Sequence, residues 1–178
     1  GSKVIVYTAH LNIASDLDAI LEAFSIVTKK CSNANLVVVG GGPMLEDFKN
    51  LAKQVGVSDN VIFTGYVATA DVAKFIKLAD LCVVYYKPKK ANYFRTSMKI
   101  RENLAMGKLV VCNDVGDLKQ FKDYTHQTKT SVEDFAQEII SSLDDKPDNS
   151  AEAIGYIRKN YSWDTIGKNF VARLEELM

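Results

Sequence analysis

The stretch from residue 87 to residue 101 carries a local concentration of positive charge. No Asp or Glu occurs between Asp80 and Glu102. The basic residues within it are Lys87, Lys89, Lys90, Arg95, Lys99 and Arg101. If Thr96 or Ser97 caps a following helix, these cations and the positive helix end meet at one place, which favours an anion such as phosphate. The alternative is a solvated basic loop without a ligand. In either case we expect the loop to be mobile, because its charges repel one another.

Glu102 lies beside these cations in the sequence. A carboxylate does not bind phosphate, but it accepts hydrogen bonds from sugar hydroxyls, as an acidic residue does for the ribose in dinucleotide-binding folds. The alternative role for Glu102 is an ion pair with Lys99 or Arg101.

Two further segments are candidates of weaker specificity. His10 follows an apolar segment, where it could reach a ligand or be merely structural or solvated. The run from Gly40 to Pro43 matches neither the dinucleotide-binding glycine pattern nor the P-loop. A tight turn, with Pro43 at the first position of a helix, explains this run.

Strands and helices, which differ in the spacing of their apolar residues, must position these side chains. Short apolar segments rich in β-branched residues predict strands at 3–8, 35–39, 60–64, 81–86 and 108–112. Helical periodicity predicts helices at 17–30, 44–55, 71–78, 97–106, 116–121, 131–143, 150–160 and 162–177, with a break at 146–148. Residues 122–130 are too polar to predict a strand, although a short edge strand could lie there.

Strands that alternate with helices predict an α/β fold with a parallel sheet covered on both faces. Right-handed crossovers make this a doubly wound, Rossmann-like sheet of five to six strands. In such a sheet the ligand binds at the carboxyl ends of the strands. The basic stretch and His10 are therefore expected at that edge.

The composition excludes several classes of protein. The chain has 178 residues, of which 47% are apolar and 25% charged, which is typical of one globular domain and not of disorder. A formal net charge of zero argues against nucleic acid as a partner and against a polybasic membrane binder. No apolar run approaches the roughly 18 residues of a transmembrane helix, so we expect no membrane insertion by this domain.

The cysteines and histidines predict neither disulfides nor a metal site. Cys31, Cys82 and Cys112 are odd in number and widely spaced, as expected for reduced thiols of a cytoplasmic protein. The two histidines, His10 and His126, form no metal-ligand spacing with them.

The motifs, in their order, resemble the donor-binding, carboxyl-terminal domain of GT-B glycosyltransferases, specifically the retaining group-1 family that uses nucleotide-sugars. The resembling segments span nearly the whole chain: 18–24 (DAILEAF), 36–45 (LVVVGGGPML), 60–67 (NVIFTGYV), 79–84 (ADLCVV), 97–114 (SMKIRENLAMGKLVVCND) and 161–164 (YSWD). The most specific is 97–114, which is similar to the family pattern S-x-K-x-x-E-x-x-A-x-G-x-P-V-V.

The resemblance implies roles for the residues around the expected helix. Glu102 matches the glutamate that holds the ribose hydroxyls of the donor. Thr96, Ser97 and Met98 occupy the helix start whose backbone amides face the diphosphate and the sugar. The resemblance also implies that the loop containing Tyr66 and Val67 cups the nucleobase.

The resemblance likewise implies a place for the diphosphate. His10 lies at the turn beside the phosphates. Arg95, Lys99 and Lys90, with the helix dipole, are expected to stabilise the leaving diphosphate without a metal ion or any other cofactor.

The chain also departs from the family pattern. Phe94 stands where the family has its first glutamate, so no catalytic residue is assigned. His10 stands in place of an arginine, and Ser15 in place of a lysine that clamps the diphosphate.

The resemblance implies a glycosyltransferase that moves a sugar from a nucleotide-diphosphate donor to a glycan or lipid-linked acceptor. Residues 3–161 would form the donor domain, after a cloning scar at 1–2. Residues 162–178 would form a helix packed towards an N-terminal acceptor-binding domain, with Trp163, Ile166, Phe170 and Leu174 as an apolar stripe left uncovered within this chain. The fragment alone is expected to be inactive and cytoplasmic, with the longer protein in the cytoplasm or peripheral to the membrane.

Two other functions stay open. One is a degenerate, non-catalytic glycosyltransferase-like domain that acts as a binding or scaffold module, suggested by Phe94 and Ser15. The other is an unrelated Rossmann protein such as a nucleotide-binding regulator.

Overall fold

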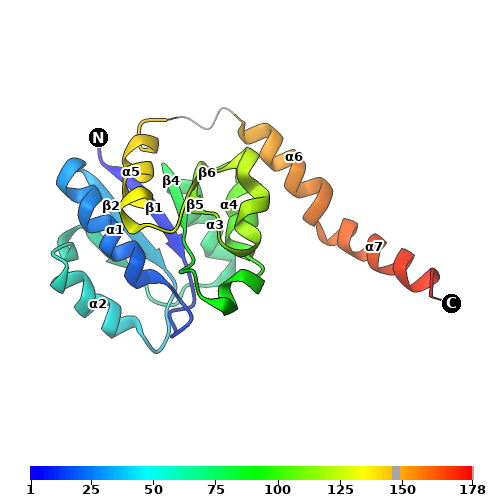
Figure 1. Ribbon diagram of the computed structural model, residues 1–178, viewed down its shortest axis with the longest axis horizontal. Helices are drawn as coiled ribbons and strands as arrows, with labels where there is room; N and C mark the ends of the chain where they lie inside the picture. The colour runs from blue at the N-terminus through cyan, green and yellow to red at the C-terminus, as the bar shows by residue number, and fades with distance from the viewer. Residues whose placement is uncertain (146–148, 178) are drawn as a thin grey trace.

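A parallel six-stranded sheet forms the centre of the molecule (Figure 1). The computed structural model describes residues 1–145 and 149–177. The strands are β1 (Lys3–Thr8), β2 (Ala34–Val39), β3 (Val61–Phe63), β4 (Leu81–Val84), β5 (Val110–Asn113) and β6 (His126–Thr128). Their order is β3-β2-β1-β4-β5-β6, so the direction of winding reverses between β1 and β4. The predicted doubly wound, Rossmann-like α/β sheet is confirmed.

Helices cover both faces of this sheet. One face carries α1 (Leu17–Lys30), α2 (Leu45–Gln54) and α5 (Val132–Ser142). The other carries α3 (Thr69–Leu78), α4 (Met98–Ala105) and α6 (Ser150–Tyr161). Short 3-10 segments lie at η1 (Ser58–Asn60), η2 (Lys90–Phe94) and η3 (Gly116–Tyr124), and α7 (Trp163–Glu175) follows α6.

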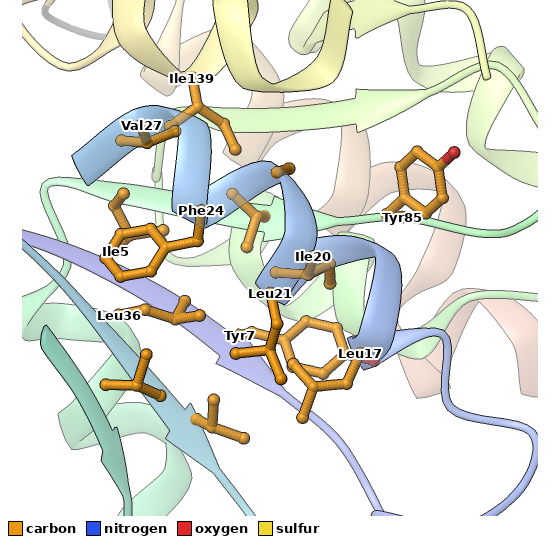
Figure 2. Packing of buried hydrophobic residues seen from close by; sticks show 14 of the residues in the cluster. Ile5, Tyr7, Leu17, Ile20, Leu21, Phe24, Val27, Leu36, Tyr85 and Ile139 are labelled. Atoms are coloured by element: carbon orange, nitrogen blue, oxygen red, sulfur yellow. The ribbon is translucent and has the colours of Figure 1, made fainter. Parts of the chain in front are cut away.

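The core is divided by the sheet because successive side chains of a strand point to opposite faces. On β1, Ile5 and Tyr7 belong to the α1 side and Val6 to the α4 side. Figure 2 shows the α1 side chains packed on the sheet: Leu17, Ile20, Leu21, Phe24 and Val27. Each of these buried apolar side chains contributes about 1.5–3 kcal/mol to folding.

Some boundaries differ from those predicted. Residues 126–128 form a short edge strand, which the polar sequence allowed but did not predict. A polar strand is possible here because β6 pairs with β5 alone and its side chains stay partly exposed. β4 ends at Val84, so the buried Tyr85 and Tyr86 follow the strand. α2 begins at Leu45, which leaves Pro43 before the helix and not at its first position. The predicted break at 146–148 lies outside the described residues.

The last helix lies away from the sheet (Figure 1). Of the other elements, α7 makes its main contacts with α6, and no residue in Trp163–Glu175 is buried. Trp163 is 81% exposed and Phe170 is 64% exposed. The prediction that this apolar stripe is not covered within the chain is confirmed.

Candidate functional site

A cleft of about 540 Å³ opens at the carboxyl edge of the sheet, beside the point where the strand order reverses. This is the position at which open α/β sheets bind their ligands. Each wall comes from a different connection. The ends of β1 and β2 contribute Thr8, Ala9, His10, Val39, Gly40 and Gly41. The loop after β3 contributes Tyr66 and Val67, and α3 contributes Thr69, Val72, Ala73 and Ile76. The last wall is α4 and its end, with Lys99, Glu102, Ala105 and Met106.

Glycines allow these connections to meet. Gly40 has φ +130°, and a Cβ atom on it would lie 1.9 Å from the carbonyl oxygen of Ala9. A Cβ atom on Gly41 would lie 2.8 Å from the ring of Tyr66. The glycine run is thus a close-packing turn that shapes the cleft between the ends of β1 and β2 and the Tyr66 loop.

Lys99 and Glu102 lie three residues apart on α4 and both face the cleft. Lys99 Nζ lies 3.2 Å from the Tyr7 hydroxyl and 4.5 Å from the centre of the Tyr7 ring. Burial, together with the nearby Arg95 cation, lowers the pKa of Lys99 to about 8, against the opposing effect of the Asp16 and Glu102 carboxylates. The cleft therefore holds a poorly hydrated ammonium group that is still charged at neutral pH.

Glu102 is exposed at the cleft. Partial burial raises its pKa, and the positive charge of Lys99 opposes that shift. Within residues 1–145 and 149–177, Glu102 forms no salt bridge, and Arg101 pairs instead with Asp117 at 3.1 Å. The ion-pair explanation of Glu102 is therefore wrong, and its carboxylate oxygens are available to a ligand.

Most of the basic stretch is paired with acids that lie far away in the sequence. Lys87 pairs with Asp18, and Lys89 Nζ lies 3.5 Å from Asp16. The segment also contains η2 and the buried Asn92. These ion pairs with buried and partly buried carboxylates count against the prediction of a mobile basic loop.

Arg95 belongs to this paired part and does not line the cleft. Its guanidinium lies 3.6 Å from Asp16 Oδ2, donates to the carbonyl of Ala14 and to Asn92 Oδ1, and covers the ring of Tyr86 at 4.4 Å. Lys90 is exposed and also lies outside the cleft lining. Arg95 and Lys90 were predicted to stabilise the diphosphate. Because neither residue lines this cleft, the structure does not support their direct contact with a ligand there.

Two backbone amides at the start of α4 have partners within the protein. Ser97 is 1% exposed, its Oγ accepts from the N–H of Ile100, and its own N–H donates to Asp117 Oδ2 at 2.9 Å. Thr96 and Met98 are exposed but do not line the cleft, and Met98 faces a separate cavity of about 200 Å³. The Ser97 amide, predicted to face the diphosphate, is occupied by the Asp117 carboxylate.

The structure thus brings together some of the predicted residues. His10, Tyr66, Val67, Lys99 and Glu102 line one cleft, whereas Arg95, Thr96, Ser97 and Met98 do not. The His10 and Tyr66 rings lie 6.1 Å apart across it.

Several polar groups of the site were not predicted from the sequence. Thr8 is 8% exposed and lines the cleft, and its Oγ1 has no hydrogen-bond partner in the described part of the chain. Tyr7 supports Lys99, while Asp16 and Asp117 hold the basic stretch. Thr8 gave a usable signal, since it is a polar residue at the end of a buried strand. Asp16 gave none, because its partners, from Lys87 to Arg95, are 71 to 79 residues away.

Phe94 lies on η2 with 82% of its surface exposed, outside the cleft lining. Ser15 is buried, and its hydroxyl donates to the carbonyl of Asn12. Neither residue supplies charge to the cleft.

Metal-ligand clusters and membrane-spanning helices are both absent from the described residues. No group of three or more His, Cys, Asp or Glu side chains among the described residues could hold a metal ion. None of the helices in 1–145 and 149–177 is both long and apolar enough to cross a bilayer. Burial raises the pKa of the Cys82 and Cys112 thiols to about 12, so these thiols are unreactive.

Comparison with known proteins decides the family. The family model described as "Glycosyl transferases group 1" matches residues 2–145. This chain belongs to the group 1 glycosyl transferases. One relative is the GDP-mannose-dependent alpha-(1-6)-phosphatidylinositol monomannoside mannosyltransferase of Mycobacterium tuberculosis, to which the chain is 27% identical over 158 residues. This alignment covers 84% of this chain and 41% of that protein. It is 35% identical over 83 residues to the alpha-monoglucosyldiacylglycerol synthase of Streptococcus pneumoniae, covering 47% of this chain and 19% of that protein.

Solved structures agree on the fold of this group 1 domain. Anabaena HepE, crystallised with UDP and glucose, superposes with a TM-score of 0.83 at 15% identity, over 98% of this chain and 48% of that one. The catalytic domain of the cholesterol-alpha-glucosyltransferase of Helicobacter pylori has a TM-score of 0.66 at 17% identity, over 94% and 99% of the two chains. The chain spans less than half the length of the two curated relatives named above.

Proposed function

We propose that this chain is the donor-binding domain of a glycosyltransferase and that its cleft holds the nucleotide-diphosphate part of a nucleotide-sugar. The observation that carries the proposal is the pair of Lys99 and Glu102 on one helix, facing one cleft at the carboxyl edge of the sheet. A carboxylate can accept from the ribose hydroxyls while the ammonium binds the diphosphate.

Other groups in the cleft fit the same ligand. Tyr66 and Val67, with the apolar residues of α3, form a wall suited to a flat nucleobase. The unpartnered Thr8 hydroxyl and His10 lie at the end of β1 and can donate to phosphate oxygens. The GDP-mannose dependence of the mycobacterial relative and the UDP in the Anabaena structure support a nucleotide-sugar as donor.

In the proposed reaction the bond between the sugar carbon and the diphosphate oxygen breaks, the acceptor oxygen forms a new bond to that carbon, and the proton of the acceptor hydroxyl passes to the released diphosphate. Negative charge then develops on the leaving diphosphate, and a cation placed there in advance lowers the barrier. Lys99 is suited to this role because it is charged at neutral pH and poorly hydrated. We therefore propose a reaction that needs no metal ion or cofactor.

The acceptor would be a glycan or a lipid-linked sugar, bound by an N-terminal domain of the same protein. The names of the two relatives, which include a phosphatidylinositol monomannoside and a diacylglycerol, support an acceptor of this class. The exposed stripe of α7 would pack against that domain. Residues 3–161 would then fold without α7, and removal of 162–178 should leave the melting temperature nearly unchanged. The free cysteines support a cytoplasmic location, either in solution or at the membrane surface.

A thermal-shift and titration series with UDP, GDP, UDP-glucose and GDP-mannose tests the proposal on this chain. A ligand that binds the folded state at 100 times its dissociation constant adds about 2.7 kcal/mol to the free energy of unfolding. Stabilisation by at least one nucleoside diphosphate is expected, without sugar transfer by this chain alone. If no nucleoside diphosphate or nucleotide-sugar shifts the melting temperature, the proposed function is wrong.

One observation favours a second function. Phe94 is exposed where the resemblance leads one to expect a glutamate, and His10 and Ser15 leave the cleft poor in cations. A non-catalytic binding or scaffold domain would show this pattern. It would bind a protein partner and, in the longer protein, transfer no sugar from any bound donor. An unrelated Rossmann regulator is excluded by the family match.

A further inference from the structure

We propose that Thr8 is a binding residue for the nucleoside part of the donor, and that its hydroxyl group gains a hydrogen-bond partner when a nucleoside occupies the cleft. The inference rests on the proposed function, since it assigns a further residue to the same nucleotide site. Thr8 is uncharged, so its effect on binding can be separated from those of Lys99 and Glu102.

The hydroxyl group of Thr8 is buried and unpaired. Thr8 is the last residue of β1 and pairs in register with Val39 of β2. It is 8% exposed, and its Oγ1 makes no hydrogen bond within the described part of the chain. Such a group lowers stability, because its bonds to water are lost without replacement. Since Thr8 also lines the cleft, a ligand there can supply the missing partner.

Thr8 belongs to the floor of the cleft, which α3 and α4 wall on either side. Successive side chains of a strand alternate between the faces of the sheet, so Thr8 lies on the same side as Val6, the side that these two helices cover. On α4, Lys99 lies in the first turn, Glu102 one turn further and Met106 just past the end, and all three line the cleft. The cleft therefore extends along α4 by about 10 Å, because each helical residue rises about 1.5 Å.

The depth of Thr8 in the cleft favours the nucleoside over the diphosphate as its partner. His10, which follows the same strand, is exposed, whereas Thr8 is buried. Both side chains can donate to a phosphate, but a charged, hydrated diphosphate is better placed near the start of α4, where Lys99 supplies a cation. The apolar lining on the Thr8 side of the sheet includes Val39 and Ile76, which also belong to the buried core. An uncharged nucleoside can enter such surroundings when its polar atoms meet a hydroxyl group.

Thr8 can present its hydroxyl group to the cleft without a change of the backbone. Rotation about the Cα–Cβ bond moves the hydroxyl and methyl groups of threonine between staggered positions. A hydroxyl group also donates and accepts, so it suits the carbonyl and amino groups of a base and the hydroxyls of a ribose. The side chain therefore fits a nucleoside in chemistry as well as in place.

Thr8→Val distinguishes a ligand-binding hydroxyl from a structural one by the opposite signs of two measurements. In the free protein the substitution removes an unsatisfied buried group, so the melting temperature should rise, by about 2–4 °C. In the complex it removes a hydrogen bond, so the affinity for the nucleoside should fall by about five- to tenfold. An unchanged affinity, or a lower melting temperature, would overturn the proposal.

Thr125→Val is the matched control. Thr125 is also 8% exposed, but its Oγ1 donates to the carbonyl of Phe121 at 2.9 Å, and it lies outside the cleft lining. Its substitution should lower the melting temperature and leave the affinity unchanged, the reverse of the Thr8 result. Thr8→Ser keeps the hydroxyl group and should bind the nucleoside nearly as the wild type does. If Thr8→Ser binds as weakly as Thr8→Val, the shape of the side chain matters and not the hydroxyl, and the proposal is wrong.

The affinities are measured by NMR titration of this chain with UDP or GDP, whichever the wild type binds more tightly, and with the matching nucleoside at up to millimolar concentration. Thr8→Val should weaken both ligands by the same factor, since both carry the group that Thr8 contacts. A loss for the diphosphate alone, or a wild type that binds the diphosphate but not the nucleoside, would refute a nucleoside contact at Thr8. Failure of the wild type to bind any nucleoside diphosphate would instead disprove the proposed function, and this inference with it.

Discussion

Two kinds of cation come from the stretch between 87 and 101. Lys87, Lys89, Arg95 and Arg101 each meet a carboxylate from a distant part of the chain. Lys99 instead meets the hydroxyl and ring of Tyr7 and faces the cleft. The difference shows that a run of positive charge in a sequence does not by itself mark an anion site. The anion site proposed above depends instead on Lys99, which has no acid partner in the described structure and lies at a concave edge.

The two surroundings also differ in what they do to the charge. Carboxylate partners hold the paired cations in place and neutralise their field. Burial beside Tyr7, with Arg95 nearby, makes the Lys99 ammonium less stable, as its lowered pKa shows. In the proposed complex the anionic diphosphate would supply the counter-charge at Lys99.

The strongest test of this comparison is the exchange of one cation of each kind for methionine. Lys99→Met should weaken UDP or GDP binding by about 100-fold, because a charge-assisted hydrogen bond contributes about 3 kcal/mol at its upper range. Lys87→Met, the matched control, should weaken it less than about twofold, since Asp18 already neutralises Lys87. Isothermal titration gives both affinities. Equal losses for the two variants would show that the cations act as one diffuse field.

Glu102→Gln tests the carboxylate that lies beside Lys99. It should weaken nucleotide-sugar binding in the longer protein by roughly 10- to 100-fold, because charge-assisted bonds to ribose hydroxyls would contribute about 1.5–3 kcal/mol. The melting temperature should stay nearly unchanged, since Glu102 forms no salt bridge in the described structure. Glu22→Gln, at an exposed position of α1 outside the cleft lining, is the control. A lower melting temperature with normal binding would make Glu102 a structural residue.

The pH dependence of binding sharpens the contrast between Lys99 and the paired cations. Because the pKa of Lys99 is lowered to about 8, its charge is largely present at pH 7 and largely lost at pH 9. Diphosphate affinity should therefore fall by about tenfold between these pH values. The buried Tyr7 does not contribute in this range, because burial raises its pKa.

Lys99→Arg should remove this fall, since a guanidinium stays charged throughout the range. Affinities measured by titration at pH 7, 8 and 9 decide the matter. A fall that is complete below pH 7 would show that Lys99 is not the group responsible.

The smallest expected effect is on stability. Lys87 and Asp18 form a partly exposed ion pair, with 32% and 37% of their side chains accessible. Lys87→Met should therefore change the free energy of unfolding by less than about 1 kcal/mol, as measured by urea denaturation. A loss of several kcal/mol would mean that this pair, and not Asp16, holds the 87–95 segment.

Much of the fold follows from local patterns. The alternation of apolar strands and amphipathic helices predicted the doubly wound sheet, because the period of side-chain burial is set by the backbone geometry of each element. The sequence did not decide whether β6 forms a strand. An edge strand with one partner and partly exposed side chains needs no apolar pattern.

For the site, the sequence by itself determined that Lys99 and Glu102 share a helix face, since residues three apart on a helix are neighbours. It also determined that the Tyr66 loop and His10 follow strands and so reach the carboxyl edge. Only the tertiary structure decided which cations remain free. The crossovers bring the β1–α1 and β4–α4 connections together, so Asp16 meets Arg95 and Asn92, and the turn after β5 brings Asp117 to the start of α4. Such contacts depend on the three-dimensional arrangement of whole elements, and no local spacing encodes them.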